Sequence, residues 1–185
     1  MCGIFAVYND KRKLALQTVF NGLKSLEYRG YDSWGIVAGS DDNRIQIIKE
    51  VGKLPQFLPK IKNKKLTSNI ALGHTRWATH GGVSKKNCHP HCDCQKEIFV
   101  VHNGIIENFN DLKKDLLDKR HRFLSETDTE VFAHLIEEEW KKTSYIKNLS
   151  NEFIQKMFRK IEGLNAFIVF LPKILQIFAI KNSSP

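Results

Sequence analysis

The chain has 185 residues, of which 42% are hydrophobic and 26% charged, a composition typical of a globular protein with one core. Its net charge of +9 suggests an anionic partner, but no aromatic residues alternate with the lysines and arginines as a base-stacking surface requires. We therefore interpret the charge as a solvated surface and expect no nucleic-acid partner. The most apolar stretch, residues 166–180, is interrupted by Pro172, Lys173 and Gln176, so we expect no membrane contact.

Hydrophobic periodicity predicts strands and helices in separate groups along the chain. We expect strands near residues 4–8, 35–38, 45–49, 69–75, 98–102, 166–170 and 174–180, and helices after Asn9-Asp10 and over 111–119, 131–142 and 151–160. The first helix should turn Leu14, Val19, Leu23 and Leu26 inward. Strands at both ends with helices between them favour an α+β fold with largely antiparallel sheet, built as one domain over residues 1–185.

Two local patterns bear on the start of a helix and on the cellular compartment. Thr127-Asp128-Thr129-Glu130 fits a capping box that opens the helix 131–142. The four cysteines show no spacing typical of a secreted disulfide framework, and the apolar run at the N-terminus is too short for a signal peptide. These observations indicate a reducing, cytoplasmic environment.

The run Cys88-His89-Pro90-His91-Cys92-Asp93-Cys94 contains the ligand types that zinc prefers. Structural zinc sites usually join two separated pairs of ligands, whereas all of these residues lie in one short loop. We therefore expect no metal, and no other cofactor is indicated.

Cys2 would become the first residue of the chain if Met1 were removed. An α-amine has a pKa near ~8 and a free thiol near ~8.5, so at neutral pH the freed amine of Cys2 can accept the proton of its own thiol. The alternative is that Cys2 is a small buried hydrophobic residue at the start of the first strand. Cys2 alone does not decide between the two.

Asn103-Gly104, after an apolar run, also has two interpretations. As a dipeptide it favours a type I′ turn in a hairpin. Alternatively, the side-chain amide of Asn103 and the backbone N–H of Gly104 are two donors suited to one oxyanion, as acyl transfer requires. Helical sequence resumes by Asn108 in place of a second strand, which weakens the hairpin interpretation.

Arg76 and Asp128 are candidates for binding a small zwitterion. Arg76 is either a surface cation or, at the end of a strand and beside Trp77, a bidentate clamp for a carboxylate. Asp128 is either a favourable charge in the first turn of a helix or a partner for an ammonium group. Together they would suit the two charged ends of a free amino acid.

Taken in chain order, several short motifs resemble those of one family, the glutaminase domain of glutamine–fructose-6-phosphate aminotransferases, which make glucosamine 6-phosphate. These motifs are Cys2-Gly3-Ile4, Tyr28-Arg29-Gly30-Tyr31-Asp32-Ser33, His74-Thr75-Arg76-Trp77-Ala78-Thr79-His80-Gly81, Asn87-Cys88-His89-Pro90-His91, His102-Asn103-Gly104 and Ser125-Glu126-Thr127-Asp128-Thr129-Glu130. They cover nearly the whole chain. The terminal Cys-Gly-Ile is shared by all class II glutamine amidotransferases, whereas Arg-Trp-Ala-Thr-His is specific to the sugar-phosphate branch.

The resemblance implies an N-terminal-nucleophile hydrolase-type fold, a four-layer sandwich of two antiparallel sheets between helical layers. It implies that Cys2 attacks the side-chain amide of glutamine through a thioester, with Asn103 and Gly104 as the oxyanion hole. Substrate binding is then assigned to Arg76 and Asp128, with Trp77, Thr79, His80 and His89 around the bound glutamine.

Three departures from the family pattern limit this resemblance. Trp34 stands where the family has a small residue, and Ser183 replaces a glycine. The sequence also ends before the family's glutaminase domain does, so we expect a truncated domain without sugar isomerase domains. Fructose 6-phosphate is then a partner only if another chain supplies those domains. A non-catalytic glutamine- or partner-binding fragment, or the glutaminase of another class II amidotransferase, stays open as an alternative.

Overall fold

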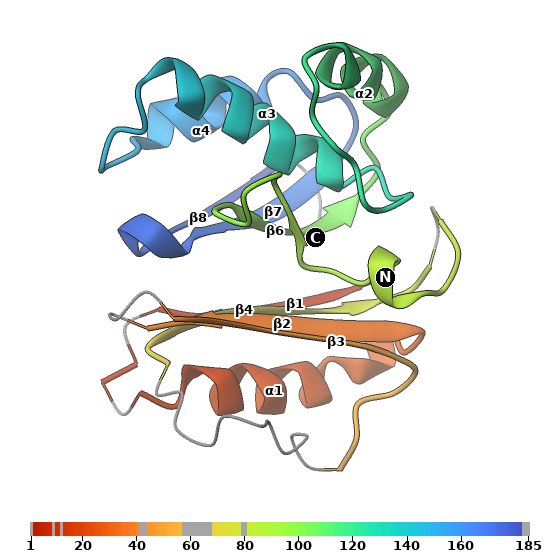
Figure 1. Ribbon diagram of the computed structural model, residues 1–185. Helices are drawn as coiled ribbons and strands as arrows, with labels where there is room; N and C mark the ends of the chain where they lie inside the picture. Colours follow the sequence, from red (N-terminus) through yellow and green to blue (C-terminus); the bar gives the residue numbers. More distant parts are fainter. Residues whose placement is uncertain are drawn as a thin grey trace. The chain divides into compact units, whose positions relative to one another are not determined.

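A computed structural model describes residues 2–8, 10–11, 13–40, 44–56, 68–78 and 81–182. The chain divides into two compact units, residues 1–90 and residues 91–185. Each unit contains one antiparallel four-stranded sheet with helix packed on it (Figure 1). The α+β class and the two antiparallel sheets predicted from the sequence are therefore confirmed.

The first unit is built on a sheet with strand order β1-β4-β2-β3. Its strands are β1 (Gly3–Val7), β2 (Ser33–Gly39), β3 (Ile45–Val51) and β4 (Ile70–Arg76), and its helices are α1 (Ala15–Ser25) and the 3₁₀ turns η1 (Glu27–Arg29) and η2 (Lys85–Asn87). The central strands β2 and β4 are buried along their whole length, while the edge strand β3 is largely half-exposed. The end of β4 is thus a firmly held position.

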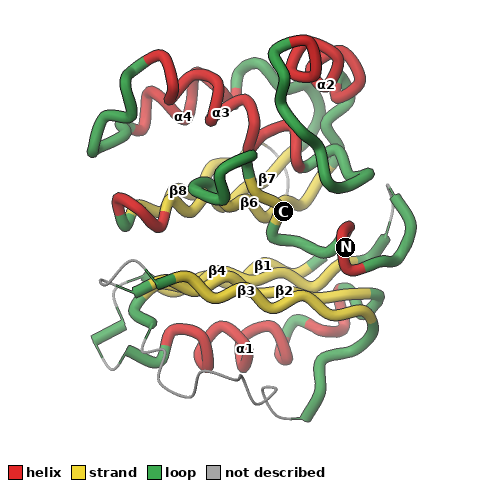
Figure 2. Tube along the Cα trace, viewed as in Figure 1, coloured by secondary structure: helices red, strands yellow, loops and turns green. Residues whose placement is uncertain are grey.

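Helix α1 covers one face of this sheet (Figure 2). Val19 and Leu23 are fully buried there, as predicted, and approach β4 so closely that a Cβ on Gly73 would lie 2.8 Å from each of them. Leu14, predicted to point inward, is 53% exposed because the helix begins only at Ala15. Trp34 packs edge-on against Phe20 of α1 at 5.8 Å, so the core accommodates this large residue.

The second unit is built on a sheet with strand order β5-β6-β7-β8. Its strands are β5 (His91–Cys92), β6 (Phe99–Gly104), β7 (Asn165–Leu171) and β8 (Gln176–Asn182), and its helices are α2 (Phe109–Asp118), α3 (Glu130–Lys142), α4 (Asn151–Phe158) and the 3₁₀ turn η3 (Pro172–Ile174). Helix α3 supplies Val131, Phe132 and Ile136, each fully buried, to a core shared with Phe167 and Val169 of β7. This core fixes α3 on the sheet.

The structure excludes the hairpin interpretation of Asn103-Gly104 and contradicts the predicted capping box. Strand β6 runs through Gly104 and pairs with β7, which begins some sixty residues later in the chain, so Asn103-Gly104 is not a hairpin turn. The capping box also does not form, because the carboxylate of Glu130 accepts hydrogen bonds from the backbone N–H groups of Leu124 and Ser125. The N-cap position of α3 is Thr129, without a side-chain cap. Helix α3 nevertheless begins at Glu130, and Asp128 lies two residues before it.

Within the described residues, the structure contains no helix with the length and apolar character needed to cross a membrane.

Candidate active site

Cys2 lies immediately before β1, beside the end of the buried strand β4. Gly3 is paired with Thr75, and the backbone N–H of Gly3 also donates to the hydroxyl of Thr75 at 3.1 Å. The backbone N–H of Trp77 donates to Sγ of Cys2 at 3.2 Å. Nε of Arg29 donates to the carbonyl oxygen of Cys2 at 3.1 Å. The position of the sulfur is therefore set by main-chain pairing, and the thiol is only half-buried.

The surroundings of Cys2 favour a neutral thiol until a base is supplied. Burial raises the pKa of the Cys2 thiol above its ordinary value, while the Trp77 N–H and the charge of Arg76 oppose this effect. In the neutral form Sγ can donate to the carbonyl oxygen of Trp77, which lies 3.7 Å away. A base acting on this sulfur would create a thiolate that already has a main-chain donor.

Arg76 is not a surface cation, since its residue is only 3% exposed. Its guanidinium donates from NH2 to the carbonyl oxygen of Gly81 at 3.0 Å and from NH1 to that of Gly82 at 3.3 Å. The side chain thus binds the main chain at Gly81 and Gly82. A buried guanidinium next to the Cys2 position is also suited to hold a substrate carboxylate.

Trp77 is 45% exposed and meets the ring of Tyr31 edge-on at 5.5 Å. The loop carrying Tyr31 also braces the chain beyond β4. The Asp32 carboxylate accepts from the Ala78 N–H at 2.9 Å, and the Asp32 N–H donates to the carbonyl oxygen of Arg76 at 3.1 Å. This supporting role of Asp32 was not predicted, although Asp32 belongs to one of the motifs that carry the family resemblance. Thr79 and His80 lie outside the described residues.

His89, predicted near the site, is buried at 5% exposure. Its ring lies 4.1 Å from that of His74, with an angle of 47° between the planes. His74 belongs to β4, two residues before Arg76, so His89 packs against the strand that carries Arg76. Cys2, Arg76, Trp77 and His89 are thus all connected through β4 in the first unit.

The second unit contains the remaining predicted residues. Asn103 and Gly104 end β6 opposite Ala166 and Asn165 of β7, and both are at least partly exposed. Gly104 has φ +136°, and a Cβ there would lie 2.3 Å from the carbonyl oxygen of Leu164. Only glycine fits this position, and Gly104 is exposed.

Asp128 lies close to the end of β6. It is 5% exposed, and its Oδ2 accepts a 2.8 Å hydrogen bond from the backbone N–H of Ile106, two residues beyond Gly104. The structure therefore brings Asp128 into the neighbourhood of the Asn103-Gly104 pair. Its position ahead of α3 is equally compatible with the helix-dipole interpretation, and the two roles do not exclude each other.

A buried network that the sequence analysis missed supports the end of β6. His102 stacks on Phe167, with 4.1 Å between the ring centroids and 3° between the planes. The amide of Asn165 donates to the carbonyl of Glu162 at 3.1 Å, which leaves its Oδ1, 2.8 Å from Nε2 of His102, as the acceptor. Nδ1 of His102 then accepts from the Thr129 hydroxyl at 2.9 Å. The position of His102 next to Asn103 was the only available sequence signal.

Known proteins with similar sequences identify the family of this chain. A family profile described as "Glutamine amidotransferase domain" matches residues 36–178. The glutamine–fructose-6-phosphate aminotransferase [isomerizing] of Thermococcus kodakarensis is 42% identical over 100% of this chain and 30% of that protein. The enzyme of the same name from Pyrococcus horikoshii is 44% identical, again over 100% of this chain and 30% of that protein. The chain thus spans about 30% of the length of these curated relatives.

The fold has a counterpart among solved structures. A structure described as the allosteric regulatory enzyme of purine biosynthesis superposes with a TM-score of 0.73 at 27% identity, covering 93% of this chain and 36% of that chain. The match confirms the amidotransferase type of N-terminal-nucleophile fold expected from the sequence. The profile extends through both units, from β2 to β8. The chain therefore belongs to the glutamine amidotransferase domain family.

Proposed function

We propose that the chain hydrolyses the side-chain amide of glutamine to glutamate and ammonia, with Cys2 as the nucleophile. The observation that carries the proposal is the position of the Cys2 sulfur, held by the N–H of Trp77 beside the buried Arg76. Membership of the glutamine amidotransferase domain family supports the same reaction. In this proposal both units, residues 1–90 and 91–185, contribute to one glutaminase domain.

The chemistry begins with the removal of Met1, which frees the α-amine of Cys2 to act as a general base. The amine takes the thiol proton, and the sulfur forms a bond to the amide carbon of glutamine while the carbonyl electron pair moves to oxygen. Collapse of this adduct restores the carbonyl, breaks the carbon–nitrogen bond and releases ammonia, which carries away the proton from the α-ammonium. Water then attacks the thioester, giving glutamate and the free thiol.

We assign the oxyanion donors to the Asn103 side-chain amide and the Gly104 backbone N–H. Two such donors directed at the developing negative charge are the usual requirement of acyl transfer. The glycine-only backbone of Gly104 and the rigid His102 network behind it support this assignment.

Substrate recognition is assigned to charged and aromatic groups. Arg76 holds the glutamine carboxylate and Asp128 its ammonium, both from buried positions where an ion pair is weakly screened. Trp77, Thr79 and His80 surround the substrate, and His89 supports the strand that carries Arg76.

In the complete reaction, the ammonia is transferred to fructose 6-phosphate. This step is the activity for which the Thermococcus and Pyrococcus relatives are named, and the chain covers 30% of each of them. It requires sugar isomerase domains in addition to the residues described. A reducing, cytoplasmic setting is part of the proposal, because the spacing of the four cysteines does not fit a secreted disulfide framework.

Ammonia release from glutamine tests the proposal most simply. Purified protein with confirmed loss of Met1 should release ammonia, Cys2→Ala should release none, and Cys92→Ala should match the parent. Equal activity in the parent and Cys2→Ala would reject nucleophilic catalysis by Cys2. Glutamine binding without turnover in the parent would instead indicate a binding fragment.

A further inference from the structure

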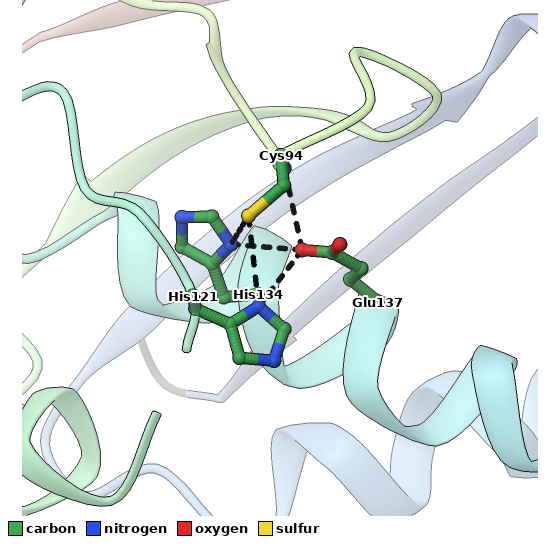
Figure 3. A group of neighbouring side chains, drawn as sticks. All are labelled: Cys94, His121, His134 and Glu137. Atoms are coloured by element: carbon green, nitrogen blue, oxygen red, sulfur yellow. Dashed lines mark hydrogen bonds and ion pairs between the residues drawn. The ribbon is translucent and has the colours of Figure 1, made fainter. Parts of the chain in front are cut away.

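Four side chains with metal-ligand atoms converge in the second unit, and none of them is among the residues assigned to glutamine. They are Cys94 in the loop after β5, His121 after α2, and His134 and Glu137 on one face of α3 (Figure 3). One ligand atom from each lies within 4.8 Å of the others. The four residues thus come from three separate segments of chain.

The distances among the four atoms are close to those of a tetrahedral zinc site. Sγ of Cys94 lies 3.9 Å from Nδ1 of His121 and 3.8 Å from Nδ1 of His134. Oε2 of Glu137 lies 2.9 Å and 3.0 Å from the same two nitrogens. Zinc–ligand bonds of ~2.0–2.3 Å at tetrahedral angles place sulfur and nitrogen ~3.6 Å apart, and nitrogen and oxygen ~3.3 Å apart. For these four of the six ligand pairs, shifts of a few tenths of an ångström reach the zinc distances, and the other two pairs lie within 4.8 Å.

The outer nitrogens of both histidines face carboxylates. Nε2 of His121 lies 3.2 Å from Oε2 of Glu138, and Nε2 of His134 lies 3.6 Å from Oε1 of Glu130. Carboxylates in this position keep the proton on Nε2 and leave the lone pair of Nδ1 directed at the cluster. His121 is thereby oriented as a metal ligand, whereas the 3.6 Å contact of His134 is too long for a hydrogen bond and only places a carboxylate nearby.

The other two ligands are supported in a similar way. Sγ of Cys94 accepts a hydrogen bond from the backbone N–H of Arg122 at 3.4 Å, which orients the sulfur. The second carboxylate oxygen of Glu137 is paired with Lys141 at 2.7 Å, so Oε2 is the oxygen directed inward. His121, His134 and Glu137 are 3% exposed or less, which keeps competing water from the cluster.

We propose that Cys94, His121, His134 and Glu137 bind one zinc ion as a closed structural site. Four protein ligands leave no coordination position for a substrate, which separates this site from a catalytic zinc. The ion would tie the loop after β5 and the segment after α2 to helix α3. The competing explanation is a metal-free network in which Glu137 accepts hydrogen bonds from both imidazoles.

The proposed ligands differ from the run of residues 88–94, which the sequence suggested as the only metal candidate. Of the cysteine- and histidine-rich run, only Cys94 contributes, because Cys88 contacts the carbonyl oxygen of Ser84 at 3.3 Å and His91 contacts the hydroxyl of Thr127 at 2.9 Å. The other three ligands lie 27 to 43 positions further along the chain, as the separations of the Cys94 contacts show. The one sequence feature that could have indicated this site is the spacing of His134 and Glu137, which lie three residues apart on a predicted helix.

The test is metal content after zinc-supplemented expression and purification without a histidine tag. The parent should contain about one zinc per chain, and Cys94→Ser and Glu137→Gln should lose most of it. Cys92→Ser is the matched control and should keep the ion. Cobalt substitution adds a direct readout, because a thiolate-to-cobalt absorption band should appear in the parent and Cys92→Ser and be absent in Cys94→Ser.

A milder pair of variants covers the case in which a ligand variant fails to fold. Glu138→Ala removes the carboxylate behind His121 and should weaken zinc binding by ~10-fold or more, whereas Glu139→Ala, the next residue on α3, should not. Parent protein that contains no zinc, and whose chelator-treated form binds none in a calorimetric titration, would overturn the proposal. So would full zinc occupancy in folded Cys94→Ser.

Discussion

The backbone N–H of Trp77 donates a hydrogen bond of 3.2 Å to Sγ of Cys2. Because the donor is a backbone N–H, its position depends on the pairing of β1 with β4 and not on the side chain of Trp77. The residue just before it, Arg76, is buried and also lowers the pKa of the Cys2 thiol against the larger effect of burial. The end of β4 thus provides both a hydrogen-bond donor to the Cys2 thiolate and a candidate binding group for a substrate carboxylate.

Arg76→Lys should raise KM for glutamine by ~10–100-fold with a smaller change in kcat. A lysine keeps the charge but loses the bidentate geometry, and a hydrogen bond to a charged group contributes ~1.5–3 kcal/mol. Steady-state ammonia release checks this, with Arg159→Lys on the exposed end of α4 as the control. An unchanged KM would remove Arg76 from substrate recognition and leave it the role of holding Gly81 and Gly82.

Asn103→Ala should lower kcat by ~10²–10³-fold, because one oxyanion donor is lost in the transition state. KM should change little. A glutamine analogue that carries an electrophile on its side chain should still label Cys2, but more slowly. The exposed Asn148→Ala provides a control for loss of an asparagine elsewhere in the same unit. A kcat within twofold of the parent would exclude Asn103 as an oxyanion donor.

Gly104→Ala should destabilise the protein by ~2 kcal/mol or more. The new Cβ would meet the carbonyl oxygen of Leu164 at 2.3 Å, on a backbone with φ +136° that alanine adopts only with strain. Urea unfolding measures the loss. Gly82→Ala, where a Cβ meets nothing within 4 Å, should be close to neutral, and equal midpoints for the two variants would contradict the observed backbone geometry.

His102 should remain neutral at pH 6.5 in the folded protein. Burial lowers its pKa below the ordinary 6.5, more strongly than the charge of Asp128 raises it. The unfolded chain then binds the proton first, so this residue makes stability fall as the pH drops below about 6.5 towards the lower folded pKa. Ring-nitrogen NMR across pH 5–8 measures the titration, and a half-protonated ring at or above pH 6.5 would contradict the prediction.

Much of the fold could be predicted because it depends on local pattern. Val19 and Leu23 follow helical spacing and are buried in α1, and the apolar runs of β4 and β6 are buried strands. The errors arise where tertiary partners override local propensity. Glu130 matches a capping box in sequence, but two backbone N–H groups at Leu124 and Ser125 bind its carboxylate instead.

The residues of the candidate site could be predicted where they belong to recognisable sequence motifs. Arg76 was named from its place at a strand end, and burial then distinguished it from a surface cation. The contributions of Asp32 and Asn165 could not be predicted, because each acts through a partner at least forty positions away. The Cys94 cluster was missed for the same reason, since its ligands meet only through the packing of α3.

The most direct measurement of the central claim is covalent labelling by a glutamine analogue that carries an electrophile on its side chain. Mass spectrometry of the digested protein should find the label on Cys2 alone, and glutamine should protect it. Retention of Met1 should abolish the labelling, because the nitrogen of Cys2 is then an amide and cannot take the thiol proton. A label on Cys88, Cys92 or Cys94, or equal labelling with Met1 present, would contradict the account.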